Sequence, residues 1–405
     1  MKILGITSRL PWPLTDGARI VMYQGLRGLA SRGHDVHLVT VEEGIGRLDL
    51  GDLEEFATLH VHRYVPGSRV LGALQSILHP RPYTHLRKDF PEVHALLDRL
   101  IDEVDFDVVY ADQSHTAHYA SRIARKWDLP YLFRSHNVEH EIWRRHLERS
   151  RWSPLRPWLA SQYGKWRRFE IEEMGYADLC AAITDRDAET IRGLLPELEV
   201  MTIPAAVDLD RFRFVDSSQR DPATLLLLGG MGWAPNRDAA IWFSGEILPL
   251  VHREIPEVVT VIVGSDPPRK ELPPENEQFR IDGYVDDILP YYRSATVGVI
   301  PLRVGGGMRV KIVEMMASGL PCVSTPIGAE GNRAVGGEHF VEGSDAEEIA
   351  RGIVRLLKSR DTRDEVAVAA RRFVEETYGF DAVAELYDHA VRRTVEIHGG
   401  KVPGR

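Results

Sequence analysis

Residues 297–314 read VGVIPLRVGGGMRVKIVE, and this stretch decides the predicted fold. Residues 297–302 are apolar and short, as in a strand that is buried on both faces of a sheet. Three glycines, Gly305 to Gly307, follow after two residues, and a helix is predicted from about Met308 to Ser318. A strand, a glycine-rich loop and a helix in this order indicate a parallel α/β sheet, in which ligands bind beyond the carboxyl ends of the strands.

The loop and the helix after it combine groups that suit a diphosphate and a sugar diol. Glycines let a ligand approach the backbone closely, and the first helical turn offers free N–H groups and a partial positive charge. Lys311 and Glu314 are three residues apart and share one helix face, so they add a cation and a carboxylate. On composition alone, a glycine-rich loop beside a solvated Lys–Glu pair is an equally good interpretation.

The same alternation of strands and helices continues on both sides of this stretch. A second-half series is predicted with strands over 224–228, 258–264, 279–284 and 321–325 and a helix over 238–255. A first-half series is predicted with strands over 2–8, 36–41, 107–111, 131–134, 179–184 and 200–203, a helix over 116–127 and a long helical stretch over 138–175. Two such series predict an α/β protein with two doubly wound parallel sheets.

A chain of 405 residues suits two domains of roughly 150–200 residues each. The boundary is expected in 204–222, which is rich in Asp, Ser and Pro. We therefore predict a first domain over 1–205 and a second over 206–375. Residues 376–405 are expected to form a helix that crosses back to the first domain, followed by a frayed tail.

Composition excludes several classes of protein. The formal net charge of −10 argues against a nucleic-acid-binding surface. The two cysteines, Cys180 and Cys322, lack metal-ligand spacing, so no disulfide framework or zinc site is expected and a reducing cytosol fits. The first residues read as a strand rather than a signal peptide, and no apolar run reaches the length of a membrane span. A cytoplasmic protein is expected.

Ordered motifs across both halves resemble the retaining glycosyltransferases of family 4, which have the GT-B fold. The motifs in the first half are Pro11 to Gly17, the sequence LASRGHDV over 29–36, Ala177-Asp178 and the link from Ile203-Pro204 to Val207-Asp208. In the second half they are Ile262 to Gly264, Gly283 to Val285 and Lys311 to Pro321. The resemblance implies two Rossmann-like domains that face a central cleft, a nucleotide sugar as donor, a glycan or lipid-linked acceptor, retention of configuration and no metal.

The resemblance also implies roles for particular residues. Glu314 is expected to bind the ribose hydroxyls, and Tyr284 and Val285 to meet the base. His136, directly after the strand over 131–134, is expected to face the donor sugar; a loop histidine is the alternative. The donor site is further assigned to Gly230, Arg237, Gly264, Gly305, Gly306 and Gly307, and the acceptor side to Asp16 and Gly17.

Two departures from the family pattern concern charge. Gly306 occupies the position of the first of two glutamates, and Gly230 and Asn236 occupy those of a phosphate-binding Arg and Lys. Arg309 and Lys311 are therefore predicted to replace the missing cations as catalytic residues. Residues two apart on a helix diverge by about 200°. Both can reach one cleft only if the helix begins at or just after Met308, which leaves Arg309 at the junction.

The missing glutamate keeps other functions open. A non-catalytic nucleotide-sugar-binding protein and a GT-B sugar-nucleotide epimerase are the two alternatives. A dehydrogenase is disfavoured, because the loop after the first strand, Ser8 to Gly17, lacks a Gly-x-Gly-x-x-Gly pattern.

Residues 143–168 form a basic segment with interleaved aromatic residues. It contains eight Arg and Lys residues and one acid, Glu148. Such a segment suits an anionic membrane surface or a lipid-linked acceptor. A solvated helix face with its tryptophans packed inward is the alternative.

Overall fold

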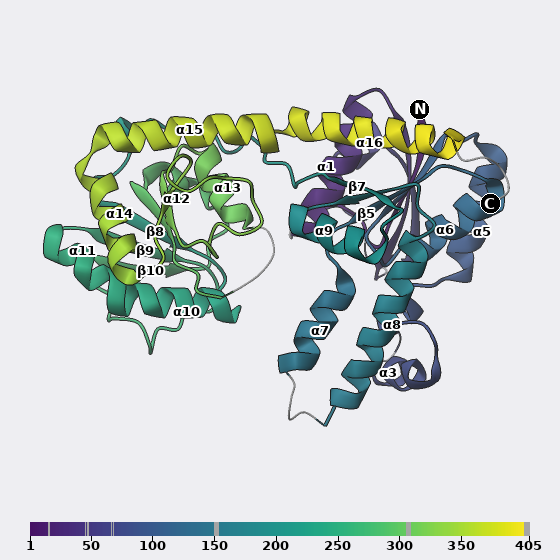
Figure 1. Ribbon diagram of the computed structural model, residues 1–405, viewed down its shortest axis with the longest axis horizontal. Coiled ribbons are helices and arrows are strands. Elements are labelled where there is room, and N and C mark those ends of the chain that lie inside the picture. Colours follow the sequence, from purple (N-terminus) through teal and green to yellow (C-terminus); the bar gives the residue numbers. More distant parts are fainter. Residues whose placement is uncertain are drawn as a thin grey trace. The chain divides into compact units, whose positions relative to one another are not determined.

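The computed structural model describes residues 1–14, 17–44, 46, 48–65, 67, 69–149, 154–304 and 309–400 (Figure 1). The chain forms two compact units. Unit 1 contains Met1–Ala205 together with the chain from Val383 onward, and unit 2 contains Ala206–Ala382. Unit 2 thus extends past residue 375, and helix α16 (Phe380–Gly400) belongs to unit 1 from Val383. The tail over 401–405 lies outside the described residues.

Unit 1 is built on a seven-stranded parallel sheet with the order β3-β2-β1-β4-β5-β6-β7. The strands β1, β4 and β5 occupy its centre, and their side chains are almost all buried, as expected for a sheet that is covered on both faces. The order reverses between β1 and β4. The strands are β1 (Lys2–Thr7), β2 (Asp35–Glu43), β3 (Thr58–Tyr64), β4 (Val108–Asp112), β5 (Tyr131–Ser135), β6 (Leu179–Ala182) and β7 (Glu199–Thr202).

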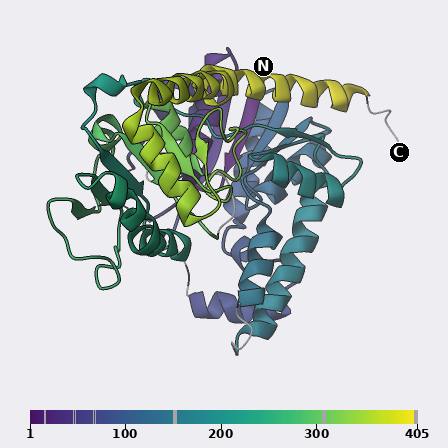
Figure 2. The same ribbon diagram turned by 60° about the vertical axis from the view of Figure 1, so that its left-hand side comes forward.

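The helices of unit 1 are α1 (Gly17–Ser31), α2 (Leu53–Phe56), α3 (Arg69–Leu78), α4 (Tyr83–Leu86), α5 (Pro91–Glu103), α6 (Ala117–Trp127), α7 (Glu139–Arg149), α8 (Arg156–Met174), α9 (Asp185–Leu194) and α16. The prediction of one long helical stretch over 138–175 was wrong, because α7 and α8 are separate helices. Pro157 at the start of α8 explains a new helix there, since proline is favoured in a first helical turn. Figure 2 shows α7 and α8 side by side, extending from unit 1.

Helix α16 packs closely on α1 through glycines (Figure 1). A Cβ at Gly25 would lie 2.9 Å from the ring of Tyr387, and one at Gly28 would lie 3.2 Å from the Cβ of Ala384. Only glycine therefore permits this approach of the two helices without a shift of the side chains. The contact closes one face of unit 1 with a segment from the other end of the chain.

Unit 2 is built on a six-stranded parallel sheet with the order β10-β9-β8-β11-β12-β13. Its strands are β8 (Thr224–Leu228), β9 (Val259–Val263), β10 (Phe279–Gly283), β11 (Val297–Ile300), β12 (Cys322–Ser324) and β13 (Val341–Glu342). Its helices are α10 (Ala234–Trp242), a π-helical turn (Phe243–Ile247), α11 (Leu248–Glu254), α12 (Leu289–Ser294), α13 (Val310–Ala317), α14 (Ala346–Lys358) and α15 (Arg360–Tyr378). The two parallel-sheet α/β units confirm the predicted fold class.

Arg220 joins the ends of α12 and α13. Its guanidinium donates to the carbonyl oxygens of Tyr292 at 2.6 Å, Ala295 at 3.0 Å and Ser318 at 2.7 Å. Cations near helix carboxyl ends satisfy carbonyls that have no partner within the helix. Burial lowers the pKa of Arg220 to about 10, so the side chain remains charged at neutral pH. The two helices that carry Tyr292 and Glu314 are thereby fixed to each other.

Candidate functional site

The carboxyl end of β8 lies where the strand order of unit 2 reverses, between β8 and β11. Such a reversal is the usual ligand position in an open parallel sheet. The Lys311 ammonium reaches this point from α13. It donates to the carbonyl oxygen of Leu228 at 2.7 Å and to Oδ1 of Asn236 at 3.0 Å. An ammonium group has three N–H donors, so these two bonds leave one donor for another acceptor.

Burial changes the acidity of Lys311. Loss of hydration is the main cause that lowers the pKa of its ammonium to about 8, and the charge of Arg309 adds to the effect. The cation is thus poorly solvated and lies near a second cation. An anion bound between them would be stabilised strongly, because charges attract more in a poorly hydrated site.

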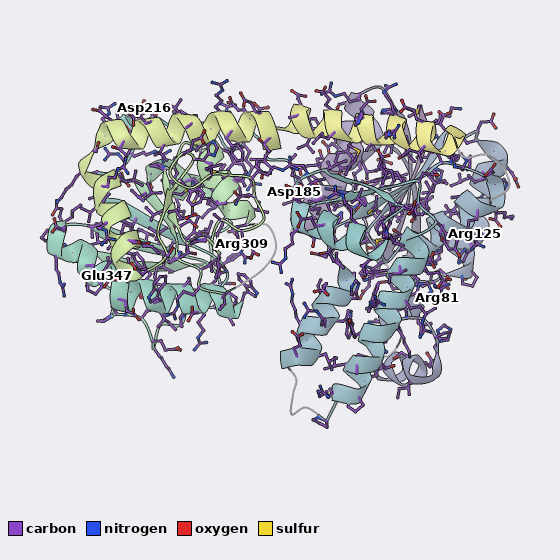
Figure 3. The ribbon with its side chains drawn as sticks, in the orientation of Figure 1. Arg81, Arg125, Asp185, Asp216, Arg309 and Glu347 are labelled. Carbon is purple, nitrogen blue, oxygen red and sulfur yellow. The ribbon has the colours of Figure 1, made fainter. Side chains whose placement is uncertain are left out.

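Arg309 stands immediately before α13. Its backbone angles, φ −92° and ψ 87°, are not helical, and α13 begins at Val310. The guanidinium lies 5.0 Å from the ring centre of Trp233, in the loop after β8 (Figure 3). Arg309 and Lys311 thus both contact the segment over 228–236, which connects β8 to α10. The glycines Gly305 to Gly307, including Gly306, lie outside the described residues.

Glu314 lies one turn further along α13. Its Oε2 accepts a 2.8 Å hydrogen bond from the hydroxyl group of Tyr292, which is fully buried in α12. Burial raises the pKa of Glu314, although the Tyr292 bond and the charge of Arg211 oppose the increase. One carboxylate oxygen is therefore oriented by Tyr292. Among the described residues the other oxygen, Oε1, has no hydrogen-bond partner, which leaves it for the diol of a ligand.

Glycines bring the ends of β8, β9 and β10 together. Gly264 has φ +147°, and a Cβ at this position would overlap the carbonyl oxygen of Gly229. The Gly264 N–H donates to the carbonyl oxygen of Gly283 at 2.7 Å. Gly230 lies beside Ser265, in the same edge of the sheet. The strand ends therefore form a continuous backbone surface.

The remaining donor-site predictions fall on the surface of unit 2. Tyr284 is 74% exposed and directly follows β10, so its ring is accessible to a base. Val285 packs partly against the core. Arg237 is exposed in α10 and paired with Glu271, so its charge is already partly compensated.

In unit 1, His136 directly follows β5 and is buried. Its Nε2 lies 2.5 Å from Oδ1 of Asp112, at the end of β4, although the N–H direction is not that of an aligned hydrogen bond. Its Nδ1 lies 3.2 Å from the side-chain Nε2 of Gln113. The Oε1 of the same side chain accepts a 2.7 Å hydrogen bond from the hydroxyl group of Ser8. Gln113 has φ +81°, an uncommon conformation for a residue other than glycine.

A buried network supports this arrangement. The hydroxyl group of Tyr110 donates to Oδ2 of Asp112 at 2.7 Å, and burial raises the pKa of Tyr110 well above its usual value. Arg134 is fully buried and donates to the carbonyl oxygens of Ala181 and Ala182. Ser8, Asp112 and Gln113 were not predicted as site residues. Ser8 and Gln113 directly follow β1 and β4, as His136 follows β5, and Asp112 ends β4, so the same rule would have found them.

The acceptor-side residues are only partly described. Gly17 begins α1, and a side chain there would meet nothing within 4 Å. Asp16 lies outside the described residues. None of the described helices combines the length and the apolar composition needed to span a bilayer.

Comparisons with known families agree with this architecture. Residues 15–211 match the family model "Glycosyltransferase Family 4", and residues 222–359 match "Glycosyl transferases group 1". The chain is 23% identical to an uncharacterized 44.6 kDa protein in the cps region of Klebsiella pneumoniae, over 93% of this chain and 96% of the relative.

Solved structures share the fold at low identity. Sucrose-phosphate synthase from Thermosynechococcus elongatus superposes with a TM-score of 0.67 at 16% identity, covering 97% of this chain and 99% of that chain. Anabaena HepE in complex with UDP and glucose gives a TM-score of 0.63 at 14% identity, covering 96% and 99%.

The two parallel sheets, with polar side chains gathered at the ends of their central strands, define a protein of the GT-B class. The family models go further, because each half of the chain matches a glycosyltransferase model: a family 4 domain over residues 15–211 and a group 1 domain over residues 222–359.

The close approach at Gly264 yields a test of the sheet edge. Gly264→Ala should lower the free energy of unfolding by more than Gly283→Ala, measured by urea denaturation. Both glycines have positive φ, which costs a non-glycine residue on the order of 1–3 kcal/mol, but only Gly264 faces a backbone oxygen. Equal losses in the two variants would contradict the tight contact between the β8 and β9 loops.

Proposed function

We propose that the chain transfers a sugar from a nucleoside-diphosphate sugar to a glycan or a lipid-linked acceptor, with retention of anomeric configuration and without a metal ion. The observation that carries this proposal is the position of the Lys311 ammonium at the end of β8. A departing diphosphate must be neutralised, and a buried cation at a ligand-binding sheet edge serves that purpose.

In this proposal, the donor-site residues of unit 2 each bind a different part of the nucleotide sugar. Lys311 and Arg309 stabilise the negative charge that develops on the diphosphate. Glu314, oriented by Tyr292, accepts hydrogen bonds from the ribose hydroxyls. The exposed ring of Tyr284 stacks on the base. The backbone at Gly230 and Gly264 approaches the phosphates closely because no side chain intervenes.

In unit 1, the residue assigned to the donor sugar is His136. His136 offers an imidazole at the sheet edge, positioned by Asp112 and Gln113. In this proposal it orients a sugar hydroxyl at the reacting end of the donor. A positioned imidazole suits this role because each ring nitrogen can donate or accept a hydrogen bond according to its tautomer.

The related structures suggest which nucleotide to test first. HepE was crystallised with UDP, with UDP and glucose, and with UDP-glucose, and a trehalose-6-phosphate enzyme from E. coli was crystallised with UDP-2-fluoro glucose. UDP and UDP-glucose are therefore the first probes, before GDP and ADP sugars.

One assay separates transfer from the alternatives. The purified protein is incubated with UDP-glucose and other nucleotide sugars in EDTA, with and without a lipid-linked glycan acceptor. We expect nucleotide release and an elongated acceptor in the presence of the chelator. Binding without turnover would indicate a non-catalytic nucleotide-sugar-binding protein, and an isomerised donor without acceptor would indicate an epimerase. Activity that requires added Mg²⁺ or Mn²⁺ would contradict metal independence.

Glu314→Ala should weaken donor binding. Hydrogen bonds to a charged group contribute roughly 1.5–3 kcal/mol, so the dissociation constant should rise about 10- to 150-fold. The measurement is calorimetric titration with UDP, and Glu347→Ala serves as a control because Glu347 is exposed on α14 (Figure 3). Unchanged affinity in a folded Glu314→Ala variant would remove the proposed ribose contact.

Lys311→Ala should lower kcat about 10²- to 10³-fold, and by more than it weakens UDP binding, because its charge acts mainly on the leaving diphosphate. A second test uses the pKa of about 8. The ammonium is charged below that value and neutral above it, so kcat/KM of the native enzyme should fall as pH rises through about 8.

Lys311→Arg is the matched control, since a guanidinium keeps its charge throughout this range. Its kcat/KM should lack the decline near pH 8, whatever its absolute value. An identical decline in Lys311→Arg would assign the titration to another group.

The basic segment 143–168 is divided between α7 and α8. Some of its aromatic side chains pack inward: Trp166 is fully buried, and Trp158 donates to the hydroxyl of Ser76 at 3.1 Å. Cations and apolar groups remain on the surface, including Arg167, Arg168 and Leu155, which is 62% exposed. We propose that this exposed part docks on an anionic membrane, where a lipid-linked acceptor resides.

Docking should depend on the exposed arginines. The protein should co-sediment with anionic vesicles at low salt and be released as salt rises, because exposed charges are screened over about 8–10 Å. Neutralising Arg167 and Arg168 should weaken binding about 30-fold, at roughly 1 kcal/mol per residue. Arg351→Ala with Arg355→Ala on α14 is the matched control. Equal binding to neutral vesicles, or none at all, leaves inward packing as the role of the segment.

A further inference from the structure

Three histidines and an aspartate, none of which has been assigned a role above, converge in unit 1. His85 comes from α4, Asp89 from the loop after it, His94 from α5 and His118 from the first turn of α6. One ligand atom from each of His85, Asp89 and His118 lies within 4.8 Å of the others. Imidazole nitrogen together with carboxylate oxygen is the donor set of zinc sites, whereas Mg²⁺ and Ca²⁺ take oxygen alone.

The separations fit one ion. Oδ2 of Asp89 lies 3.5 Å from Nε2 of His85, and Oδ1 of Asp89 lies 3.5 Å from Nε2 of His118. Two atoms bound to the same tetrahedral Zn²⁺ at its usual bond lengths are about 3.3–3.5 Å apart. These distances are too long for good hydrogen bonds. The Asp89 carboxylate thus lies between the two imidazoles, with one oxygen toward each of them, and both separations suit two ligands of one ion.

His118 carries the strongest sign that a ligand is accommodated. It is buried, and neither of its ring nitrogens has a hydrogen-bond partner among the described residues. A buried imidazole without hydrogen-bond partners is unfavourable unless something binds it.

His94 differs from the other two histidines. Its Nε2 lies 2.8 Å from Oδ1 of Asp89, a hydrogen-bond distance that is too short for two ligands of one tetrahedral ion. His94 therefore holds the carboxylate in position. Such outer hydrogen bonds are a regular part of metal sites and tune affinity.

An open cavity gives access to the cluster. Its volume is about 570 Å³, and His85, Asp89, His94 and His118 line it. Arg81 and Arg125 line the same cavity (Figure 3). The charge of Arg81 is compensated by Glu173 at 2.9 Å, and the guanidinium of Arg125 lies over the ring of Tyr176.

We propose that His85, Asp89 and His118 bind one Zn²⁺, with a fourth position open to the cavity and with His94 as a positioning residue. The ion ties α4, the start of α5 and α6 together. The expectation of no zinc site considered cysteine spacing, whereas these ligands are spread over 85–118 and meet only in the folded unit. The available signal was the spacing His85-x₃-Asp89, which brings together two of the three ligands, with the positioning residue His94 close by.

The test is metal binding by the full-length protein, independent of transferase activity. After chelation and desalting, Zn²⁺ is titrated against a fluorescent zinc indicator, and Co²⁺ is used to record the visible absorption that marks a four-coordinate site. We expect one ion per chain. Asp89→Asn and His118→Gln should each weaken binding by more than His94→Gln, for which a loss of about 10- to 100-fold is expected.

Matched controls decide the assignment. Asp102→Asn and His389→Gln remove an exposed aspartate and an exposed histidine elsewhere in unit 1 and should leave affinity unchanged. Asp89 is partly exposed, so Asp89→Asn should fold even if His118→Gln does not, which circular dichroism would show. The proposal is overturned if the native protein binds no Zn²⁺, or if Asp89→Asn binds it as tightly as Asp102→Asn.

Discussion

Every strand pair in the two described sheets is parallel, and the position of both sites depends on this constraint. Parallel strands all present their carboxyl ends at one edge, so residues that follow different strands become neighbours there. In unit 1 the edge gathers Ser8, Gln113 and His136 from three strands that are adjacent in space but far apart in sequence. In unit 2 it gathers the ends of β8 and β9 with the start of α13.

The sheet edge also receives a cation from a distant part of the sequence. Asn236 stands where the family resemblance leads one to expect a lysine. The Lys311 ammonium lies 3.0 Å from the Asn236 amide oxygen, so a cation arrives beside that position from another helix. The attraction between a phosphate and a cation depends on the distance between the charges and on their hydration, and not on which helix or strand carries the cation. The short Asn236 side chain leaves room for the longer Lys311.

Strand–helix order, and hence the fold, could be predicted because the buried strands are apolar runs bounded by Gly and Pro. The strands β1, β8 and β11 fall where the pattern places them. The strand β3, which no expectation covered, is only half-buried and alternates His, Arg and Thr with apolar residues, so it lacks such a run.

Site prediction was limited by contacts between distant residues. Lys311 and Glu314 could be singled out because they lie in one motif. Their partners Leu228, Asn236 and Tyr292 could not, since each contact spans 22 to 83 residues of chain. The histidine–aspartate cluster has the same origin, because His118 joins the others only through the packing of α6.

Unit 1 is discontinuous, and this affects the order of events during protein synthesis. The ribosome releases residues 1–205 long before α16, yet the Gly25 face of α1 has its partner, Tyr387, only in that last helix. Domains generally fold as units while the chain emerges. Unit 2 lies entirely within residues 206–382, so its last segment is synthesised before the last segment of unit 1. The nascent chain therefore leaves the Gly25 face of α1 without its α16 partner until all the strands of unit 2 have been synthesised.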